Sequence, residues 1–402
     1  MRILYILIAI LLVLTFINSS TWYYDYDEFS HYRSLQNMQD DWWFNAWQRG
    51  GFKALYYPFK SLPLDGLRFI NAVALLMGLY LLFIKRLRNP DGIFVVLSSP
   101  LVVSMGYRFY PEITAFILIV YILYFQYRDW PIPRFLLIGY LPLIRPELIV
   151  LWPVMVMYDW QLWRRKWCSA IILIPGFLYW VASWIVLGSP TAILSTYTDV
   201  ASSSAHSGSI TTYLGNLGMA FGIWGFMAWR GFIVHKLPLI SVSVIIAVYS
   251  LMYWAGVGSI WGYDRHLIIL APFIAMGVTF ISPMIYRKIA ITCAFIVALL
   301  VGRAEPSGEM LVIDKFADQL PPYSKIVCQH PYLNHTLNVP LIDSRHERIS
   351  RWNGKLGSGE YLIWDSHKAA RYIPLDSLRS TYTIKGGLQE GNFAIAIAGL
   401  KE

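Results

Sequence analysis

Charged side chains are scarce in this sequence of 402 residues. Asp, Glu, Lys and Arg make up only 14% of it, whereas an ordinary soluble domain has about a quarter. Cysteine is also scarce: Cys168, Cys293 and Cys328 are scattered and predict no disulfide framework, and no closely spaced Cys and His residues predict a zinc site. These shortages argue against a water-soluble globular enzyme and against a disulfide-rich or zinc-binding fold. Hydrophobic residues, in contrast, make up 56% of the chain.

The net charge of +9 does not indicate a nucleic-acid partner. Residues 304–402 contain 11 basic and 11 acidic residues, so the whole excess belongs to residues 1–303, with 22 basic and 13 acidic residues. There the basic residues form short clusters between apolar runs, which is typical of membrane topology signals and not of one basic binding face. We therefore expect a lipid bilayer, and no nucleic acid, as partner.

The apolar runs predict a polytopic α-helical membrane protein with about 11 transmembrane helices. Residues 3–17 form the first run, which no small-residue cleavage site follows, so we interpret it as an uncleaved membrane helix. The run 135–158 is broken by Pro142, Arg145, Pro146 and Pro153 and predicts two short helices that meet near one membrane face. The other runs are 68–84, 93–106, 113–127, 168–187, 212–229, 238–255, 267–285 and 289–302.

Lys and Arg residues predict the orientation of these spans. One set of short connections carries 13 of them, and the alternate, longer loops carry seven. The first set is therefore cytoplasmic, with the amino terminus, and residues 304–402 lie outside the cytoplasm. Helix-like Met310–Leu320 and strand-like segments in this tail predict a small extracytoplasmic α/β domain. The strand-like segments are Lys325–Cys328, Tyr361–Trp364 and Phe393–Ala398. We expect two domains, 1–303 with a first outer loop at 21–67, and 304–402.

Three carboxylates, Asp25, Asp27 and Glu28, follow the first apolar run within four residues. Near a membrane such groups repel one another and lose hydration, so we expect them to serve a metal ion, a cationic ligand or a proton transfer. The alternative is helix capping, since anions suit the amino-terminal end of a helix. Capping explains one carboxylate more easily than three. His31 is interpreted as a polar neighbour of this cluster.

Basic residues mark two further outer loops. Arg108 and Glu112 lie between the third and fourth runs, where they either pair with each other or bind a ligand. Arg145 stands in apolar sequence, which favours a function, although Glu147 is close enough in sequence to pair with it.

The segment Asp264-Arg265-His266 precedes another apolar run. An Arg with an adjacent His at the outer end of a span suits a phosphate at the bilayer surface. An interfacial Arg reaching the lipid headgroups is the alternative, and Asp264 is a second possible counter-charge.

These motifs resemble those of the GT-C superfamily of polyprenyl-phosphate-sugar-dependent glycosyltransferases. Tyr26-Asp27-Glu28 resembles the Asp-Glu motif in the first outer loop of its mannosyltransferase branch. Asp264-Arg265-His266, with Pro272 following, is similar to that branch's late acid-x-Arg-aromatic motif. The resemblance covers the layout of the whole chain and implies a polytopic fold with an extracytoplasmic active site. Asp25-Tyr26 stands where that branch has His-Pro, so mannose is not implied as the sugar.

The resemblance implies a hexosyltransferase that moves a sugar from a polyprenyl-phosphate carrier to a glycolipid, polysaccharide or protein acceptor outside the cytoplasm. Asp27 is then the catalytic base, with Glu28 as the alternate, and Arg265 meets the charge of the leaving phosphate, with Arg145 or Arg108 as substitutes. One base and in-line departure invert the anomeric centre. The other residues expected to bind substrate are Tyr26, His31, Glu112, Asp264 and His266.

Asp25 and Glu28 are candidate ligands of a divalent ion, Mg²⁺ or Mn²⁺, and no other cofactor is expected. Two competing functions remain open, a transporter or flippase of lipid-linked sugars and a polysaccharide polymerase or ligase. Transport predicts charges deep in several spans and two related halves, which the sequence lacks. We expect a bacterial plasma membrane rather than the endoplasmic reticulum, and a product that is a glycan of the cell envelope.

Overall fold

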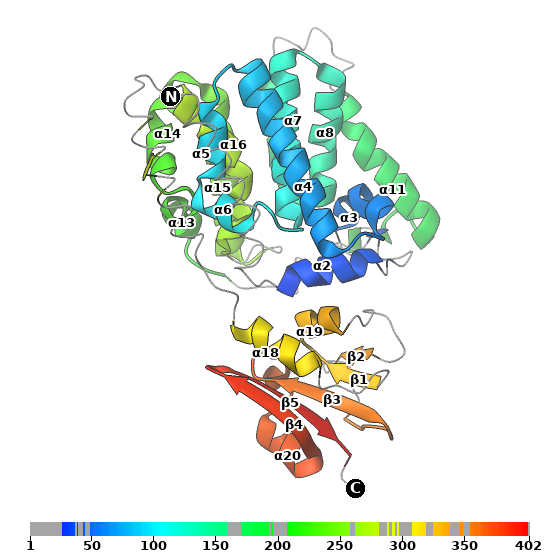
Figure 1. The fold of residues 1–402 in the computed structure, drawn as a ribbon. Coiled ribbons are helices and arrows are strands. Elements are labelled where there is room, and N and C mark those ends of the chain that lie inside the picture. Colours follow the sequence, from blue (N-terminus) through cyan, green and yellow to red (C-terminus); the bar gives the residue numbers. More distant parts are fainter. Residues whose placement is uncertain are drawn as a thin grey trace. The chain divides into compact units, whose positions relative to one another are not determined.

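The computed structural model describes residues 26–36, 38, 43–44, 49–158, 170–192, 194–195, 207–257, 262–280, 288, 292–293, 296, 308–318, 325–337, 346–348 and 354–400. They form two compact units (Figure 1). The first lies within residues 39–303. The second joins helix α2 (Tyr26–Gln36) to the chain after residue 304. Helix α2 belongs to the outer loop 21–67, which we expect in the first domain, but it groups with the second unit.

The first unit is a bundle of helices around α7, which packs against α4 and α8. Pro111 is the first residue of α7, where a backbone N–H would make no hydrogen bond within the helix, so proline costs nothing there. The helical elements of this unit are α3 (Gly50–Tyr56), η3 (Tyr57–Phe59), α4 (Leu64–Leu79), η4 (Tyr80–Arg86), α5 (Asp91–Leu97), α6 (Pro100–Met105), α7 (Pro111–Arg128), α8 (Pro131–Ile144), η5 (Pro146–Val150), α9 (Leu151–Tyr158), η7 (Ile171–Leu173), α11 (Ile174–Leu187), α13 (Thr212–Phe221), α14 (Ile223–Val234), α15 (Lys236–Ala255), η8 (Asp264–Leu270) and α16 (Ala271–Thr279). Every residue of α16 is buried, between α5, α14 and α15.

The predicted break in the 135–158 run is present. Helix α8 ends at Ile144, Arg145 is extended (φ −140°, ψ 104°), and a short 3-10 helix leads into α9. Pro146 explains this, because proline disfavours helical geometry in the residue before it. The Arg145 side chain therefore projects from an extended backbone between two helices.

The run 212–229 differs from the continuous segment expected. It folds as two helices, α13 and α14, bent by 107°. Gly222 lies between them with φ 56° and ψ −135°, a conformation that only glycine adopts readily.

Within the described residues, two helices are long and apolar enough to cross a membrane, Leu64–Arg86 and Lys236–Ala255. The bent pair would make a third. The count of about 11 spans thus stays a prediction, partly because the runs 3–17 and 289–302 fall outside or mostly outside the described residues.

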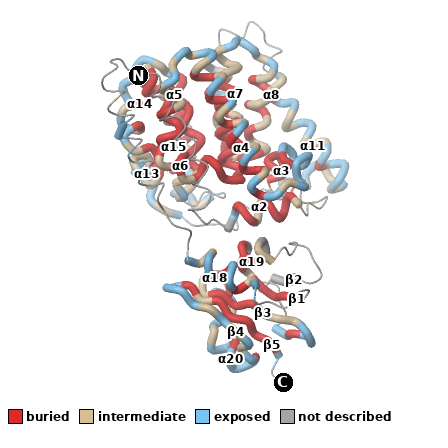
Figure 2. The backbone as a smooth tube through the Cα atoms, viewed as in Figure 1, coloured by how far each residue is buried: buried red, intermediate tan, exposed pale blue. Residues whose placement is uncertain are grey.

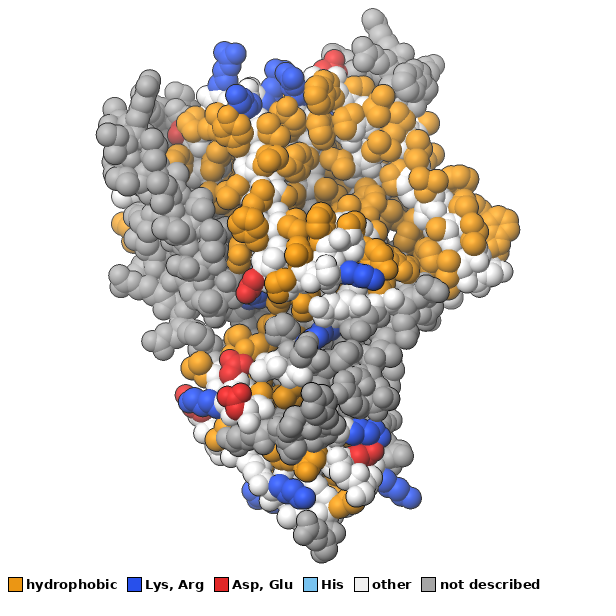
Figure 3. Space-filling view, turned by 45° about the vertical axis from the view of Figure 1, so that its right-hand side comes forward, with side chains coloured by type: hydrophobic (Ala, Val, Ile, Leu, Met, Phe, Trp, Pro, Cys, Tyr) orange, Lys and Arg blue, Asp and Glu red, His pale blue; other side chains and the backbone are white. Residues whose placement is uncertain are grey.

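Buried residues concentrate inside the helical unit, and apolar side chains also cover part of its surface (Figures 2 and 3). On α11, Phe177 is 59% exposed and Ile185 is 77% exposed. Large apolar side chains exposed in such number are costly in water but suit a lipid environment. This surface agrees with the membrane location expected from the sequence.

The second unit contains a five-stranded sheet in the order β2-β1-β3-β5-β4. Strand β1 (Lys325–Cys328) is parallel to β2 (His346–Arg348) and β3 (Glu360–Asp365), whereas β5 (Phe393–Gly399) is antiparallel to β3 and to β4 (Thr383–Glu390). Helices α18 (Gly308–Ala317) and α19 (Pro331–Thr336) lie on one side of the sheet and α20 (Leu375–Thr381) on the other (Figure 1). A short 3-10 helix, η10 (Ala369–Arg371), precedes α20.

The core of this sheet follows the alternation of its strands. Leu362 and Trp364 of β3 pack with Leu378 of α20, while Ile363 between them is buried on the opposite face. The three strand-like segments predicted from the sequence correspond to β1, β3 and β5. The small α/β tail is therefore present as a compact fold.

Candidate active site

A buried cluster of ionisable side chains forms in the helical unit around Arg145. Its Nη1 lies 2.8 Å from Glu112 Oε1 at the first turn of α7, and its Nη2 forms an ion pair with Glu147 Oε1. The Arg145 and Glu112 side chains are 5% and 4% exposed. Arg145 thus pairs with Glu147, which the sequence left open as the alternative to a functional role, and also with a second carboxylate, Glu112. With two carboxylates around it, the guanidinium charge is fully met inside the protein.

His266 joins this cluster from η8. Its Nδ1 lies 3.0 Å from Arg145 Nη2 and 3.2 Å from Glu112 Oε1, and its side chain is 1% exposed. The ring also lies near Tyr249, with centroids 6.0 Å apart and edge-to-face geometry. Three segments distant in sequence therefore meet at one carboxylate: the start of α7, the break after α8 and the start of η8.

Arg265 is the more accessible cation beside this cluster. Its Cζ lies 5.3 Å from the ring centre of Tyr110 and 5.0 Å from that of Tyr263, within the range of cation–π attraction. Its Nε is 3.8 Å from Glu112 Oε1, and its side chain is 16% exposed. The two tyrosine rings restrict the position of the Arg265 guanidinium. Arg265 and Arg145 both lie near the Glu112 carboxylate. Arg265 can therefore bind an anion more readily than the buried Arg145 can.

Asp264 and Arg108 are held by other contacts. Asp264 accepts a hydrogen bond from the amide of Asn216 in α13. The Arg108 side chain is buried, and its backbone carbonyl accepts a hydrogen bond of 2.9 Å from Asn71 Nδ2 of α4. Asn71 in turn contacts Tyr56, whose hydroxyl lies 2.8 Å from Thr114 Oγ1. This chain of buried polar contacts fixes the loop before α7.

The sequence reasoning did not single out Lys53 of α3. Its side chain is fully buried, and burial lowers its pKa to about 7 because the charged ammonium is disfavoured away from water. Helix α3 approaches α8 closely: a Cβ on Gly51 would lie 2.4 Å from Leu143 Cβ, and Tyr140 donates a hydrogen bond of 2.7 Å to the Gly51 carbonyl. The sequence alone does not show that Lys53 is buried. Its burial is a consequence of the close packing of α3 in the helical unit.

The acidic motif lies in the second unit, at the start of α2. Asp27 and Glu28 occupy the first turn, where the helix dipole favours anions, as the capping interpretation expects. Asp27 is exposed and Glu28 is completely buried. His31 is partly buried, and its carbonyl accepts a hydrogen bond of 3.1 Å from Ser34 Oγ. Tyr26 begins the helix, and Asp25 lies outside the described residues.

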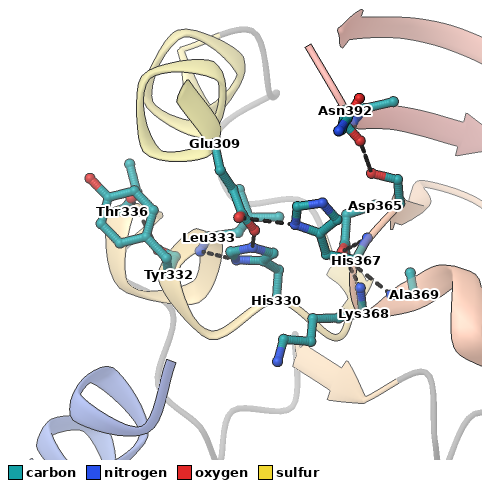
Figure 4. A network of polar contacts seen from close by, with 12 residues as sticks. Glu309, His330, Tyr332, Leu333, Thr336, Asp365, His367, Lys368, Ala369 and Asn392 are labelled. Atoms are coloured by element: carbon teal, nitrogen blue, oxygen red, sulfur yellow. Dashed lines mark hydrogen bonds and ion pairs between the residues drawn. The ribbon is translucent and has the colours of Figure 1, made fainter. Parts of the chain in front are cut away.

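A polar network that the sequence did not predict lies in the same unit (Figure 4). Glu309 of α18 bridges two imidazoles: its Oε1 is 2.7 Å from His330 Nε2 and its Oε2 is 3.0 Å from His367 Nδ1. Among the described residues, no group of three or more His, Cys, Asp or Glu side chains has the arrangement to hold a metal ion. The metal site suggested at Asp25 and Glu28 stays a prediction.

The fold of the whole chain is similar to that of a solved structure. It superposes on the crystal structure of ArnT from Cupriavidus metallidurans bound to undecaprenyl phosphate, with a TM-score of 0.67 and 13% sequence identity, covering 98% of this chain and 97% of that chain. No family model matches the sequence, and no curated protein sequence matches it. At this identity the likeness is one of fold. The chain therefore shares its fold with this structure over nearly the whole length of both chains.

Proposed function

We propose that this protein is a membrane glycosyltransferase that uses a polyprenyl-phosphate-linked sugar as donor. The observation that carries the proposal is the fold shared with ArnT over nearly the whole of both chains. ArnT was crystallised with undecaprenyl phosphate. The second support is local, because the helical unit holds a partly exposed arginine beside a network of buried charges that are already paired.

We propose Arg265 as the residue that binds the phosphate of the donor. Glu112 and Glu147 neutralise the charge of Arg145, so Arg145 would attract the phosphate of a donor only weakly. Arg265 is farther from Glu112, is partly exposed and is held between two tyrosine rings. The buried pairs have a positioning role, since Glu112 contacts Arg145 and His266 and lies near Arg265.

In the proposed reaction Asp27 takes the proton of an acceptor hydroxyl. The hydroxyl oxygen attacks the anomeric carbon, the bond between that carbon and the phosphate oxygen breaks, and the polyprenyl phosphate leaves with the electron pair. Arg265 stabilises the charge that develops on the phosphate. Displacement from the opposite side inverts the anomeric centre. The exposure of Asp27 and the burial of Glu28 favour Asp27 as the base.

Binding of undecaprenyl phosphate to the purified full chain tests the proposed donor site. Loss of a charge-assisted hydrogen bond is worth about 1.5–3 kcal/mol, so Arg265→Gln should weaken binding roughly 10- to 100-fold. Arg265→Lys should bind with intermediate strength, because lysine keeps the charge but lacks the planar fork. Arg230→Gln, at an exposed arginine of α14, is the matched control. Equal binding by the wild type and Arg265→Gln in native mass spectrometry would contradict the assignment.

The acceptor, the sugar and the extracytoplasmic location in a bacterial plasma membrane are part of the same proposal. Mass spectrometry should compare the envelope glycolipids of a strain that has the gene with those of a strain that lacks it. In the strain without the gene, one lipid or glycan should lack one sugar. Complementation with Asp27→Asn should leave that sugar missing although the protein is expressed. Restoration of the product by Asp27→Asn would end the assignment of Asp27 as base.

A further inference from the structure

The buried guanidinium of Arg145 has three partners within the helical unit. Its Nη1 donates a hydrogen bond of 2.8 Å to Glu112 Oε1. Its Nη2 forms an ion pair with Glu147 Oε1 and lies 3.0 Å from His266 Nδ1. Each of these nitrogens carries two hydrogens, so Nη2 can donate to both of its partners at once. The two carboxylates therefore fix the guanidinium in place, with one N–H group directed at the imidazole.

The contact with Arg145 determines which nitrogen of His266 carries the proton. A guanidinium donates hydrogen bonds and cannot accept them, so His266 Nδ1 accepts this bond. A protonated ring would set a second cation against Arg145, so the ring is neutral and its hydrogen is on Nε2. In the other tautomer Nδ1 would donate to Glu112 Oε1, 3.2 Å away, and its hydrogen would face the N–H groups of Arg145. The contacts therefore favour the Nε2–H tautomer.

The Nε2–H group of His266 has no hydrogen-bond acceptor among the residues that the structure describes. The side chain is 1% exposed, and a buried N–H group without an acceptor destabilises a folded protein. Native structures rarely keep such a group unless it has a function. Three tyrosine rings lie around the imidazole with centroid distances of 6.0 to 6.4 Å, those of Tyr213, Tyr249 and Tyr263. The unmet donor therefore points to an acceptor atom that a ligand supplies.

His266 lies beside the arginine that we assign to the donor phosphate. Arg265 Nε is 3.8 Å and His266 Nδ1 is 3.2 Å from the same oxygen, Glu112 Oε1. The ring centre of Tyr263 lies 5.0 Å from Arg265 Cζ and 6.3 Å from the centre of the imidazole. Arg265 is partly exposed and Tyr263 is 48% exposed. The imidazole is thus flanked by two residues that reach the surface, so a ligand bound at Arg265 is adjacent to it.

We propose that His266 donates its Nε2–H to an oxygen of the donor phosphate, and that Arg145 is a positioning residue that fixes this tautomer. The inference rests on the proposed function and adds a second phosphate ligand to Arg265. Arg265 supplies positive charge, whereas His266 supplies a neutral donor with a fixed direction. A phosphate oxygen is a strong, charged acceptor, so the bound donor satisfies the buried N–H group.

Native mass spectrometry of the purified full chain with undecaprenyl phosphate or with undecaprenol separates phosphate recognition from lipid binding. His266→Asn lacks a donor at the Nε2 position, so it should bind undecaprenyl phosphate roughly 10-fold or more weakly and undecaprenol as the wild type does. His266→Gln, whose amide nitrogen can take the place of Nε2, should restore most of the affinity. His235→Asn, at a histidine whose ring stacks on Phe280, is the matched control and should bind both lipids normally.

The position of the proton can be measured without a ligand. Nuclear magnetic resonance of the full chain in detergent, with ¹⁵N-labelled histidine and His266→Gln to assign the signal, should show the hydrogen on Nε2 in the wild type. Arg145→Lys keeps a charge near the two carboxylates but has one nitrogen in place of two. In that variant the hydrogen should move to Nδ1, where it can bond Glu112. A merely structural role of Arg145 predicts no such change.

Several results would overturn the inference. An Nδ1–H ring in the wild type would do so, as would equal binding of undecaprenyl phosphate by His266→Asn and the wild type. Equal weakening of both lipids in His266→Asn would show a general packing defect instead of a lost phosphate contact. If Arg265→Gln weakens binding and His266→Asn does not, only this inference fails. If the wild type does not distinguish undecaprenyl phosphate from undecaprenol, the proposed donor site fails, and the inference with it.

Discussion

Replacement of Lys53 by methionine should make the protein more stable at neutral pH. The folded protein holds this side chain fully buried, with a pKa of about 7, whereas a lysine in an unfolded chain has a pKa of about 10.4. Below pH 7 the ammonium is charged in both states, and the full penalty of burying it weighs on the folded state. Methionine has a similar length and no charge, so Lys53→Met removes the penalty.

The size of the effect follows from the displaced pKa. Between pH 7 and 10 the unfolded chain binds a proton that the folded chain lacks, so the free energy of unfolding rises with pH. Each pKa unit corresponds to about 1.4 kcal/mol, so three pH units contribute about 4 kcal/mol. The wild type should therefore gain this amount between pH 7 and 10, and Lys53→Met should lack that part of the pH dependence.

Thermal unfolding in detergent, followed by the fluorescence of the 17 tryptophans, measures this difference. At pH 7 the midpoint of Lys53→Met should exceed that of the wild type by several degrees, and the gap should narrow toward pH 10. Lys60→Met is the matched control, since Lys60 is exposed in the same predicted outer loop and bonds Tyr57 at 3.0 Å. Parallel pH profiles for the wild type and Lys53→Met would refute the reasoning.

Two further predictions concern the packing of α14. A Cβ at Gly231 would lie 1.7 Å from the backbone oxygen of Gly277, which cannot move aside, so Gly231→Ala should abolish the yield of folded protein. Gly225→Ala is the control and should fold normally, because its Cβ would lie 3.5 Å from the nearest atom. Equal yields of the two variants would contradict the close approach of α14 and α16. Trp224→Phe removes a hydrogen bond of 3.0 Å to Ser98, so it should lower stability by about 1 kcal/mol in the same thermal assay.

Local chemistry made several features predictable. Pro146 required an extended Arg145, and the apolar segments of the tail predicted β1, β3 and β5. Strand β4 was missed because Gly386 and Gly387 interrupt it and most of its other side chains are polar. It forms because its backbone pairs with β5 at the edge of the sheet. The bend at Gly222 was likewise missed, since glycine permits a break without requiring one.

The sequence by itself determined the membrane character, the division into an apolar helical part and a charge-balanced tail, and the residue types able to bind a phosphate. Hydrophobicity, proline geometry and charge act locally, so they can be read along the chain. Only the tertiary structure decided that Glu112 neutralises Arg145 and contacts His266, and that α2 packs on the carboxy-terminal domain. Those contacts join residues far apart in sequence, and whether a charge is paired or accessible depends on which of them meet in the folded chain.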